Sequence, residues 1–337
     1  MASWNDGAVR DELLGFVSAV TTPGSDDFVP ARDRVAVFDN DGTLWAEQPT
    51  FAQAYFLRDR LVELAAADPT LRQDPAVAAV LSGGDAALHA LSKRDVVELV
   101  ARTHGGMSAD EFDALARAWF ARAKHPRFGR PFPECAYAPM LELLDHLRAN
   151  GFSIFVVTGG GVDFVRAIAE ETYGVPRANV IGSSTRARFV DRAGSSYVEK
   201  LPELGSFDDG EAKPENIHLH VGRRPILAFG NSDGDLAMLA YARGGAGQRA
   251  AFLLHHDDAE REVAYDRDFR LSPLDRGLEV AAERGFRLVS MKRDFARVFA
   301  RSEERTTVAR RTAARGNEGA DDGEAKAIPR SDQHRHP

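Results

Sequence analysis

The chain has 337 residues, of which 44% are hydrophobic and 28% charged, a globular composition that allows one large domain with an insertion, or two domains. Its formal net charge of -8 argues against nucleic acid or an anionic membrane surface as the main partner, because either would favour a cationic face. A small anionic substrate is not excluded, since lysine, amide groups and a metal ion can hold a phosphate inside an acidic protein.

The sequence carries no pattern of secretion or membrane insertion. Its first twenty residues mix charged with apolar positions, unlike a signal peptide. No apolar run approaches the roughly 20 residues that span a bilayer. The single cysteine, Cys135, excludes an intrachain disulfide. We therefore expect a cytoplasmic protein without a membrane or nucleic-acid partner.

Three buried strands are predicted, each followed by a polar or glycine-rich cluster. After a short helix over 13–20, the runs 34–38, 152–157 and 225–229 have the apolar character of central strands in a parallel sheet, and a helix over 139–149 precedes the second. The clusters are DNDGT at 39–43, TGGG at 158–161 and GNSDGD at 230–235. Because ligands of open α/β sheets bind outside the carboxyl ends of the strands, we expect the clusters to converge in one crevice.

The segment between the first two strands is too long for a simple crossover and predicts an all-helical cap. Helices are expected over 51–67, 75–81, 93–103 and 108–123, the last with a capping box of Ser108 and Glu111. We also expect a helix over 162–173 and a β-hairpin over 181–200 that turns at 193–194. The predicted domains are an α/β core of residues 1–45 and 136–299, a cap of residues 46–135, and a disordered tail of residues 300–337.

The first cluster places two carboxylates at a strand end, where a tight glycine turn begins. This arrangement suits covalent phosphoryl transfer, because one carboxylate can attack phosphorus while the other delivers a proton to the leaving oxygen. We predict that Asp39 is the nucleophile, forming an aspartyl-phosphate, and that Asp41 is the general acid and then the base that activates water. Two carboxylates and a phosphate dianion repel one another, so a divalent cation is required, and Mg²⁺ suits the hard oxygen ligands.

A calcium loop is the main alternative for this segment. A loop starting at Asp39 would need glycine at its sixth position and glutamate at its twelfth, where the chain has Leu44 and Thr50, and a loop starting at Asn231 fails in the same way. A purely structural Asx-turn is the other alternative.

The remaining clusters supply groups that suit a phosphate. The Thr158 hydroxyl and the Gly159 N–H lie just before a predicted helix, whose N-terminus favours anions, although a flexible turn would need the same glycines. Lys213 could neutralise both the nucleophile and the phosphate as a point charge. A lone lysine is usually a solvated surface residue, but this one lies between the second and third clusters.

In this order and spacing the clusters resemble the motifs of the haloacid dehalogenase-like superfamily. The resemblance covers roughly residues 34–245: DNDGT is similar to the first motif, Thr158-Gly159 to the second, Lys213-Pro214 to the third and the 230–235 segment to the fourth. The helical insertion resembles the cap of phosphoserine phosphatase-like members. The resemblance implies a Rossmann-like doubly wound parallel sheet with an inserted α-helical cap domain, and a metal bound by the Asp39 carboxylate, the Asp41 backbone carbonyl and a fourth-motif side chain.

The fourth motif departs from the family pattern. It usually begins Gly-Asp, whereas this chain has Asn231 at the second position. Either a neutral amide oxygen replaces a metal-binding carboxylate, or Asp233 or Asp235 supplies the negative charge at the metal. A glutamate shortly after the first motif contacts the substrate amine in phosphoserine phosphatases. Glu47 lies one residue before that offset and Gln48 occupies it, so serine phosphate is one candidate substrate.

These observations favour a magnesium-dependent hydrolase of a small phosphorylated metabolite. The resemblance argues against a dehalogenase, because dehalogenases do not keep an acid at the position of Asp41. One alternative is a phosphomutase. The other is a weak or silent member of the family that binds a phosphorylated ligand or a partner, and Asn231 favours this second alternative. Residues 255–258 are expected to be a solvated polar loop, and the oligomeric state is not predicted.

Overall fold

In a computed structural model, the described residues are 1–90, 95, 99–100, 103–192 and 194–300. Residues Met1–Ala300 form one compact unit. The helix expected over 93–103 lies largely outside the described residues, and so does the tail beyond residue 300. None of the described helices is both long and apolar enough to cross a membrane.

The described residues form a seven-stranded sheet in the order β4-β3-β2-β1-β5-β6-β7. Its strands are β1 (Val35–Phe38), β2 (Ser153–Gly161), β3 (Val180–Arg192), β4 (Ser195–Ser206), β5 (Leu227–Gly230), β6 (Ala250–His255) and β7 (Arg287–Ser290). All neighbours run parallel except β3 and β4, which are antiparallel. The prediction of a doubly wound α/β sheet is confirmed, with β1 at its centre between β2 and β5.

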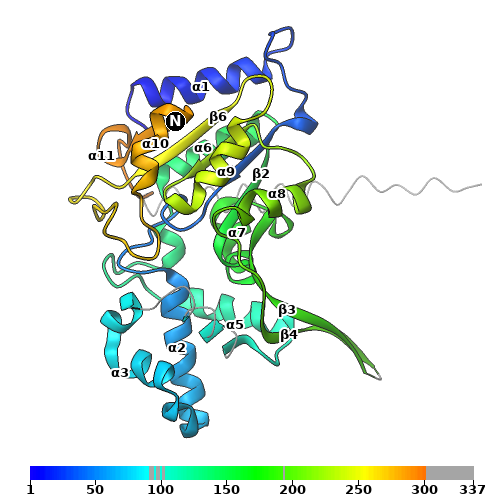
Figure 1. The fold of residues 1–337 in the computed structure, drawn as a ribbon, viewed down its shortest axis with the longest axis vertical. Helices are drawn as coiled ribbons and strands as arrows, with labels where there is room; N and C mark the ends of the chain where they lie inside the picture. The colour runs from blue at the N-terminus through cyan, green and yellow to red at the C-terminus, as the bar shows by residue number, and fades with distance from the viewer. Residues whose placement is uncertain (91–94, 96–98, 101–102, 193, 301–337) are drawn as a thin grey trace, which may run out of the picture. The chain divides into compact units, whose positions relative to one another are not determined.

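Helices pack around this sheet, and a second group of helices follows β1 (Figure 1). The first group is α1 (Ala8–Thr21), α6 (Ala138–Ala149), α7 (Val162–Tyr173), α8 (Ala212–Val221), α9 (Leu236–Arg243), α10 (Arg276–Arg284) and α11 (Met291–Asp294). The second group, here called the cap helices, is α2 (Ala52–Ala67), α3 (Pro75–Ala90) and α5 (Ala109–Arg122). The helical insertion is confirmed, while its boundaries at 46 and 135 stay a prediction.

The cap helices begin and break where the local sequence requires. The capping box at the start of α5 is confirmed: the Glu111 N–H donates to the Ser108 hydroxyl at 3.1 Å, and the Ser108 N–H donates to the Glu111 carboxylate at 2.7 Å. Helix α3 is longer than the expected 75–81 and is interrupted at Gly84, whose φ of 58° lies in the left-handed region that favours glycine.

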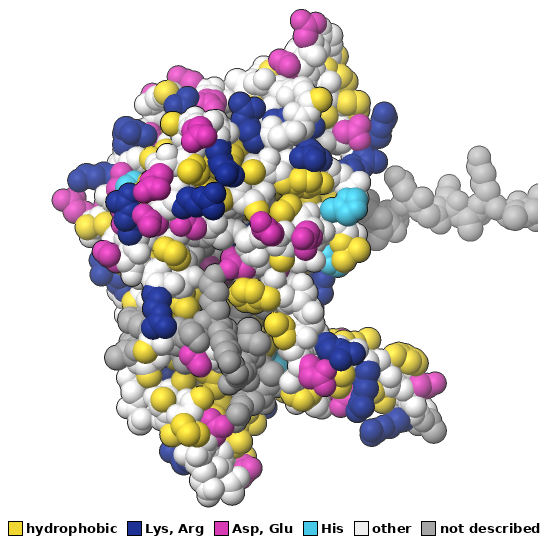
Figure 2. All heavy atoms as spheres, in the orientation of Figure 1, with side chains coloured by type: hydrophobic (Ala, Val, Ile, Leu, Met, Phe, Trp, Pro, Cys, Tyr) yellow, Lys and Arg dark blue, Asp and Glu magenta, His cyan; other side chains and the backbone are white. Residues whose placement is uncertain are grey.

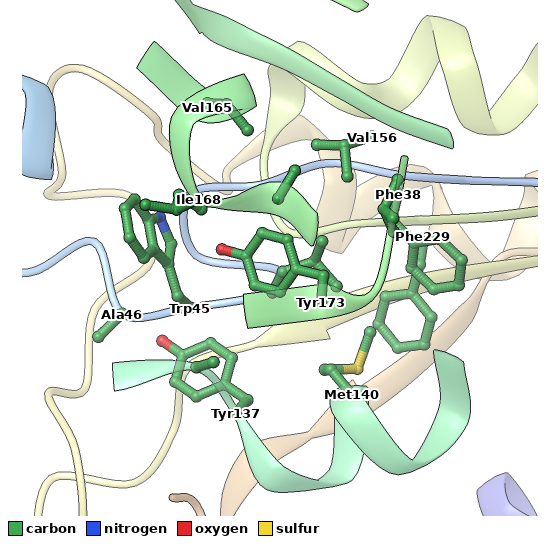
Figure 3. Close-up of a cluster of buried hydrophobic side chains, with 14 of the residues drawn as sticks. Phe38, Trp45, Ala46, Tyr137, Met140, Val156, Val165, Ile168, Tyr173 and Phe229 are labelled. Carbon is green, nitrogen blue, oxygen red and sulfur yellow. The ribbon is translucent and has the colours of Figure 1, made fainter. Parts of the chain in front are cut away.

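One part of the hydrophobic core lies between β1 and the helices α6 and α7 and fixes the start of the loop after β1. Every residue of β1 is buried, and the rings of Phe38 in β1 and Phe229 in β5 stack with their centroids 6.2 Å apart. Figure 3 shows Met140 of α6 and Ile168 of α7 in the same cluster, with Trp45 from the loop after β1. Close packing of this kind leaves the backbone that follows β1 little freedom.

The predicted hairpin is confirmed and is longer than expected. Strand β3 starts in the central sheet, beside β2, and then pairs with β4, where Phe189 lies opposite Val198. Figure 1 shows the two strands extending away from the sheet. In Figure 2 this arm carries basic, acidic and apolar side chains side by side.

Candidate active site

The loop that follows β1 turns sharply at Gly42, in a conformation that favours glycine. The Asp39 N–H donates to the Phe229 carbonyl at 2.9 Å, and the turn closes when the Gly42 N–H donates to the Trp45 carbonyl at 2.9 Å. The φ of Gly42 is 77°. A Cβ at this position would lie 2.1 Å from the Asn231 amide nitrogen and 2.4 Å from Glu47 Oε1, so Gly42 is required by both its backbone conformation and its neighbours.

Lys213 lies between two carboxylates. Its Nζ is 2.6 Å from Asp39 Oδ1 and 2.6 Å from Asp235 Oδ1, and it also donates to the Val157 carbonyl at 3.1 Å. Burial alone would lower the pKa of Lys213, but the carboxylates of Asp235 and Asp39 raise it above its usual value. Burial and the nearby Asp235 carboxylate raise the pKa of Asp39, against the opposing effect of Lys213. The nucleophile predicted from the sequence therefore contacts a charged lysine.

Asp41 lines one cavity together with Asp39 and Lys213 and is partly exposed. Its Oδ1 accepts the Trp45 indole N–H at 2.8 Å, and its Oδ2 accepts the Asn40 amide at 3.3 Å. Removal from water raises the pKa of Asp41, opposed by the hydrogen bonds from Trp45 and Asn40. A raised pKa keeps a carboxyl group protonated closer to neutral pH, as a general acid requires.

The glycine-rich cluster continues β2 and lies beside Asp41. The Thr158 hydroxyl accepts the Gly160 N–H at 2.9 Å, and the Gly161 N–H donates to Gln53 Oε1 in α2 at 2.7 Å. A Cβ on Gly160 would lie 3.5 Å from Asp41 Oδ2 and 3.4 Å from Gln53 Oε1. The cluster is therefore close to both the first motif and a cap helix.

The acidic cluster after β5 divides between two places. Asn231 Oδ1 accepts the Thr43 hydroxyl at 3.0 Å, which joins this cluster to the loop after β1. Asp235 Oδ2 accepts the backbone N–H groups of Asn231 and Ser232, both at 3.0 Å. The Asp233 carboxylate instead accepts N–H groups at the start of α10, at 3.0 Å from Arg276 and 2.8 Å from Gly277. Asp233 thus satisfies donors that a helix N-terminus otherwise leaves unpaired.

Replacing Asp233 by alanine is expected to lower the free energy of unfolding by about 1 kcal/mol, because α10 loses its N-terminal acceptor. Binding of Mg²⁺ at the cavity, where a titration detects it, should not differ from wild type. Asp233→Asn, which keeps an acceptor oxygen, is the matched control and should lose less stability. Chemical denaturation and calorimetric titration with Mg²⁺ measure the two quantities, and a clear loss of Mg²⁺ affinity in Asp233→Ala would identify Asp233 as a ligand instead.

The three clusters and Lys213 surround one cavity of about 110 Å³. The cap helices line it as well, through Gln53, Ala54 and Leu88. A second cavity of about 60 Å³ shares Gln53, Gly159 and Phe207 with the first. The structure therefore brings together the strand ends that the sequence analysis expected to converge, with additional space beside them for the rest of a substrate.

The oxygen donors around this cavity fit a hard divalent cation. The structure describes no group of three or more His, Cys, Asp or Glu side chains arranged as a metal site. The Asp39 carboxylate and the Asp41 carbonyl are nevertheless donors of the kind that Mg²⁺ prefers, and so is the amide oxygen of the buried Asn231, whose neighbour Ser232 lines the cavity. Glu47 also lines the cavity, and its Oε2 is buried without a hydrogen-bond partner among the described residues. Burial raises the pKa of Glu47, opposed by the hydrogen bond from Tyr265.

Several residues of the site carry no signal in the sequence. Trp45 contacts Asp41, Gln53 contacts the glycine cluster and Tyr265 contacts Glu47, but these three residues follow no recognisable motif. The expectation of a solvated loop is wrong at His256, which is buried with Nε2 2.7 Å from the Gly42 carbonyl and Nδ1 3.3 Å from Glu262. The apolar residues within the long polar segment between β6 and α10, among them Tyr265, Phe269, Leu271 and Leu274, are the signals of burial that the sequence offers there.

Comparison with known proteins places this architecture in a family. A family model described as haloacid dehalogenase-like hydrolase matches residues 36–240, which is more than half of the chain. The chain belongs to the haloacid dehalogenase-like hydrolase family. Among proteins with curated descriptions, none matches this sequence.

Solved structures show a similar fold at low sequence identity. A conserved, functionally unknown protein from Anaerococcus prevotii DSM 20548 has a TM-score of 0.54 at 16% identity, covering 84% of this chain and 91% of that one. A protein with unknown function from Bordetella pertussis Tohama I has a TM-score of 0.47 at 17% identity, covering 76% and 97%. A phosphoserine phosphohydrolase-like protein from Francisella tularensis subsp. tularensis SCHU S4 has a TM-score of 0.39 at 15% identity, covering 77% and 95%. At these identities the first comparison supports the fold alone.

Proposed function

We propose that this hydrolase is a magnesium-dependent phosphomonoester hydrolase that acts through an aspartyl-phosphate on a small phosphorylated metabolite. The observation that carries the proposal is the Asp39 carboxylate, 2.6 Å from Lys213 Nζ, in the same cavity as the partly exposed Asp41. A nucleophile beside a fixed positive charge, with a separate acid within the cavity, meets the needs of phosphoryl transfer.

In the first step a carboxylate oxygen of Asp39 attacks phosphorus, and the bond from phosphorus to the leaving oxygen breaks. Asp41 gives its proton to that oxygen, so the product leaves as an alcohol. Lys213 offsets the negative charge of the nucleophile. The Thr158 hydroxyl and the Gly159 N–H hold the phosphoryl oxygens beside it.

In the second step the Asp41 carboxylate takes a proton from water, and the water oxygen attacks phosphorus. The bond between phosphorus and Asp39 breaks, which releases inorganic phosphate and restores the Asp39 carboxylate. The proton now on Asp41 is ready for the next leaving group, so one residue serves as acid and then as base.

Mg²⁺ would be held by the Asp39 carboxylate, the Asp41 backbone carbonyl and the Asn231 amide oxygen. When bound, it supplies positive charge that offsets the repulsion between the carboxylates and the phosphate. Asp235 is engaged by Lys213 and by two backbone N–H groups, so we assign it to holding Lys213 and the loop. Asp233 stabilises α10.

Hydrolysis of p-nitrophenyl phosphate with and without Mg²⁺ tests this function directly. A panel of small phosphomonoesters, including serine phosphate, would then identify the substrate. Absence of turnover in the wild-type protein with every ester would favour the alternative of a silent member that binds a phosphorylated ligand or a partner. Return of the phosphoryl group to another position of the substrate would identify a phosphomutase.

Replacing Asp41 by asparagine is expected to lower steady-state turnover by about 10²–10⁴-fold, because both proton transfers lose their group. With p-nitrophenyl phosphate, whose leaving group needs little protonation, the first step should persist and the second should fail. Rapid mixing should therefore show a burst of one p-nitrophenolate per protein.

An alkyl phosphate is the matched control for this variant. Its leaving group does need a proton, so neither a burst nor a phosphorylated protein should accumulate. Unchanged steady-state turnover in Asp41→Asn would contradict the assignment of Asp41 as acid and base.

A further inference from the structure

We infer that Glu47 orients the amide of Asn231 toward the cation and, once the cation is bound, supplies the negative charge behind that amide. Glu47 is thus a positioning residue of the metal site. This inference rests on the proposed function, since it concerns the same cation. It adds a residue and an arrangement of charge that the motif pattern does not contain.

The contacts of Asn231 determine which end of its amide faces which neighbour. Its Nδ2 donates to Glu47 Oε1 at 2.8 Å, and its Oδ1 accepts the Thr43 hydroxyl at 3.0 Å. A carboxylate can only accept, so Glu47 fixes the NH₂ end of the amide on its own side. The Asn231 oxygen is thereby directed toward the loop that carries the nucleophile, as a ligand residue is oriented by the group behind it.

Glu47 is itself held as an acceptor. The Tyr265 hydroxyl donates to the same Oε1 at 2.6 Å, and the Glu47 side chain is fully buried. Both donors come from segments far away in the sequence, one after β5 and one after β6. A neutral glutamine could keep both contacts, its Oε1 accepting from Asn231 and Tyr265, but would not keep the charge.

The second oxygen of Glu47 points to a cation. Oε2 is buried and has no hydrogen-bond partner in the described part of the chain, yet Glu47 lines the cavity together with Asp39 and Asp41. A buried polar oxygen without a partner is costly. A positive charge in this cavity would remove that cost, and Lys213 is already shared by Asp39 and Asp235.

The side chains of Asn231 and Glu47 are complementary, and either one changed alone breaks the match. An aspartate at position 231 would place two carboxylate oxygens at the present 2.8 Å separation, where they repel. An aspartate at 231 with a glutamine at 47 would restore one donor, one acceptor and one charge. Gly42 packs against both side chains, so the pair also contacts the nucleophile loop directly.

The test moves the carboxylate from position 47 to position 231 and the amide from 231 to 47 in the full-length protein. Calorimetric titration measures the Mg²⁺ affinity, and thermal melting in a chelator measures the stability of the metal-free protein. Glu47→Gln should weaken Mg²⁺ binding by about 10- to 100-fold. Asn231→Asp should lower the melting temperature of the metal-free protein. The double variant Asn231→Asp/Glu47→Gln should recover both the Mg²⁺ affinity and the melting temperature toward wild type.

Glu262→Gln is the matched control, because Glu262 is also buried and hydrogen-bonds His256 without contacting Asn231. Combined with Asn231→Asp, it should restore neither quantity. The inference is overturned if Glu47→Gln binds Mg²⁺ as tightly as wild type, or if the double variant is no better than the single ones. If the wild-type protein hydrolyses phosphomonoesters, either of these two results overturns the inference about Glu47 and leaves the proposed function intact. A wild-type protein with neither turnover nor Mg²⁺ binding overturns the inference and the proposed function together.

Discussion

Replacing Asp39 by asparagine is expected to lower kcat for p-nitrophenyl phosphate by on the order of 10⁴- to 10⁶-fold, the loss typical of removing a covalent nucleophile. An amide of the same shape cannot form the acyl-phosphate, so no other step can compensate. The fold should survive, because Lys213 keeps its contact with Asp235 at 2.6 Å. Steady-state kinetics and a far-ultraviolet spectrum measure the two effects.

Trapping the phosphorylated protein distinguishes loss of the nucleophile from general damage to the site. Asp41→Asn, quenched in acid during turnover of p-nitrophenyl phosphate, should carry one phosphoryl group in a mass spectrum, because its second step fails. Asp39→Asn should carry none. A phosphorylated Asp39→Asn variant, or one that keeps wild-type turnover, would place the nucleophile elsewhere.

Replacing Lys213 by methionine is expected to destabilise the metal-free protein by about 3–5 kcal/mol, because it leaves two buried carboxylates without their cation. The side chain of Lys213 is only 3% exposed, so water cannot replace it. Activity should also fall by roughly 10²–10³-fold, since the charge that faces the phosphoryl group is lost. Chemical denaturation in a chelator and kinetics with Mg²⁺ measure the two losses.

Two further variants show whether the carboxylates cause the instability. Lys292→Met removes an exposed lysine and should change stability by less than about 0.5 kcal/mol. Lys213→Met/Asp235→Asn removes one of the unpaired carboxylates and should be more stable than Lys213→Met alone. If the double variant is less stable still, then lost packing rather than unpaired charge explains the effect.

The parts of the fold that could be predicted are those with a local signal. The strand over 34–38 is a short apolar run that stops at a polar turn, and the helix over 162–173 has a periodic apolar face between glycines. Strands β6 and β7 were not predicted, because short apolar runs such as 250–255 do not distinguish a buried strand from part of a helix. The extra length of β3 and β4 depends on their pairing with each other, which no local pattern reveals.

Within the site, too, some residues could be predicted from a local sequence pattern and others could not. Asp39 and Asn231 follow parallel strands, and Thr158 lies near the carboxyl end of a third, so topology alone predicts that they meet at one edge of the sheet. Gln53 reaches the glycine cluster from a cap helix, and Tyr265 reaches Glu47 from the loop after β6. Those contacts depend on how separate elements pack, and the sequence gives no measure of that packing.

The register of β1 also determines when during synthesis the site can form. Val35 lies opposite Ser153 in β2, and Ala36 lies opposite Leu227 in β5. The pairing of β1 with each of these two strands therefore closes a very long loop of the chain. Pairings between residues so distant in sequence form slowly, because the entropy of loop closure opposes them. A ribosome-bound chain that has not yet released β5 lacks one of the two neighbours of β1. Asp39, the proposed nucleophile, is thus translated well before β5, and its position in the fold is completed only once β5 has been made.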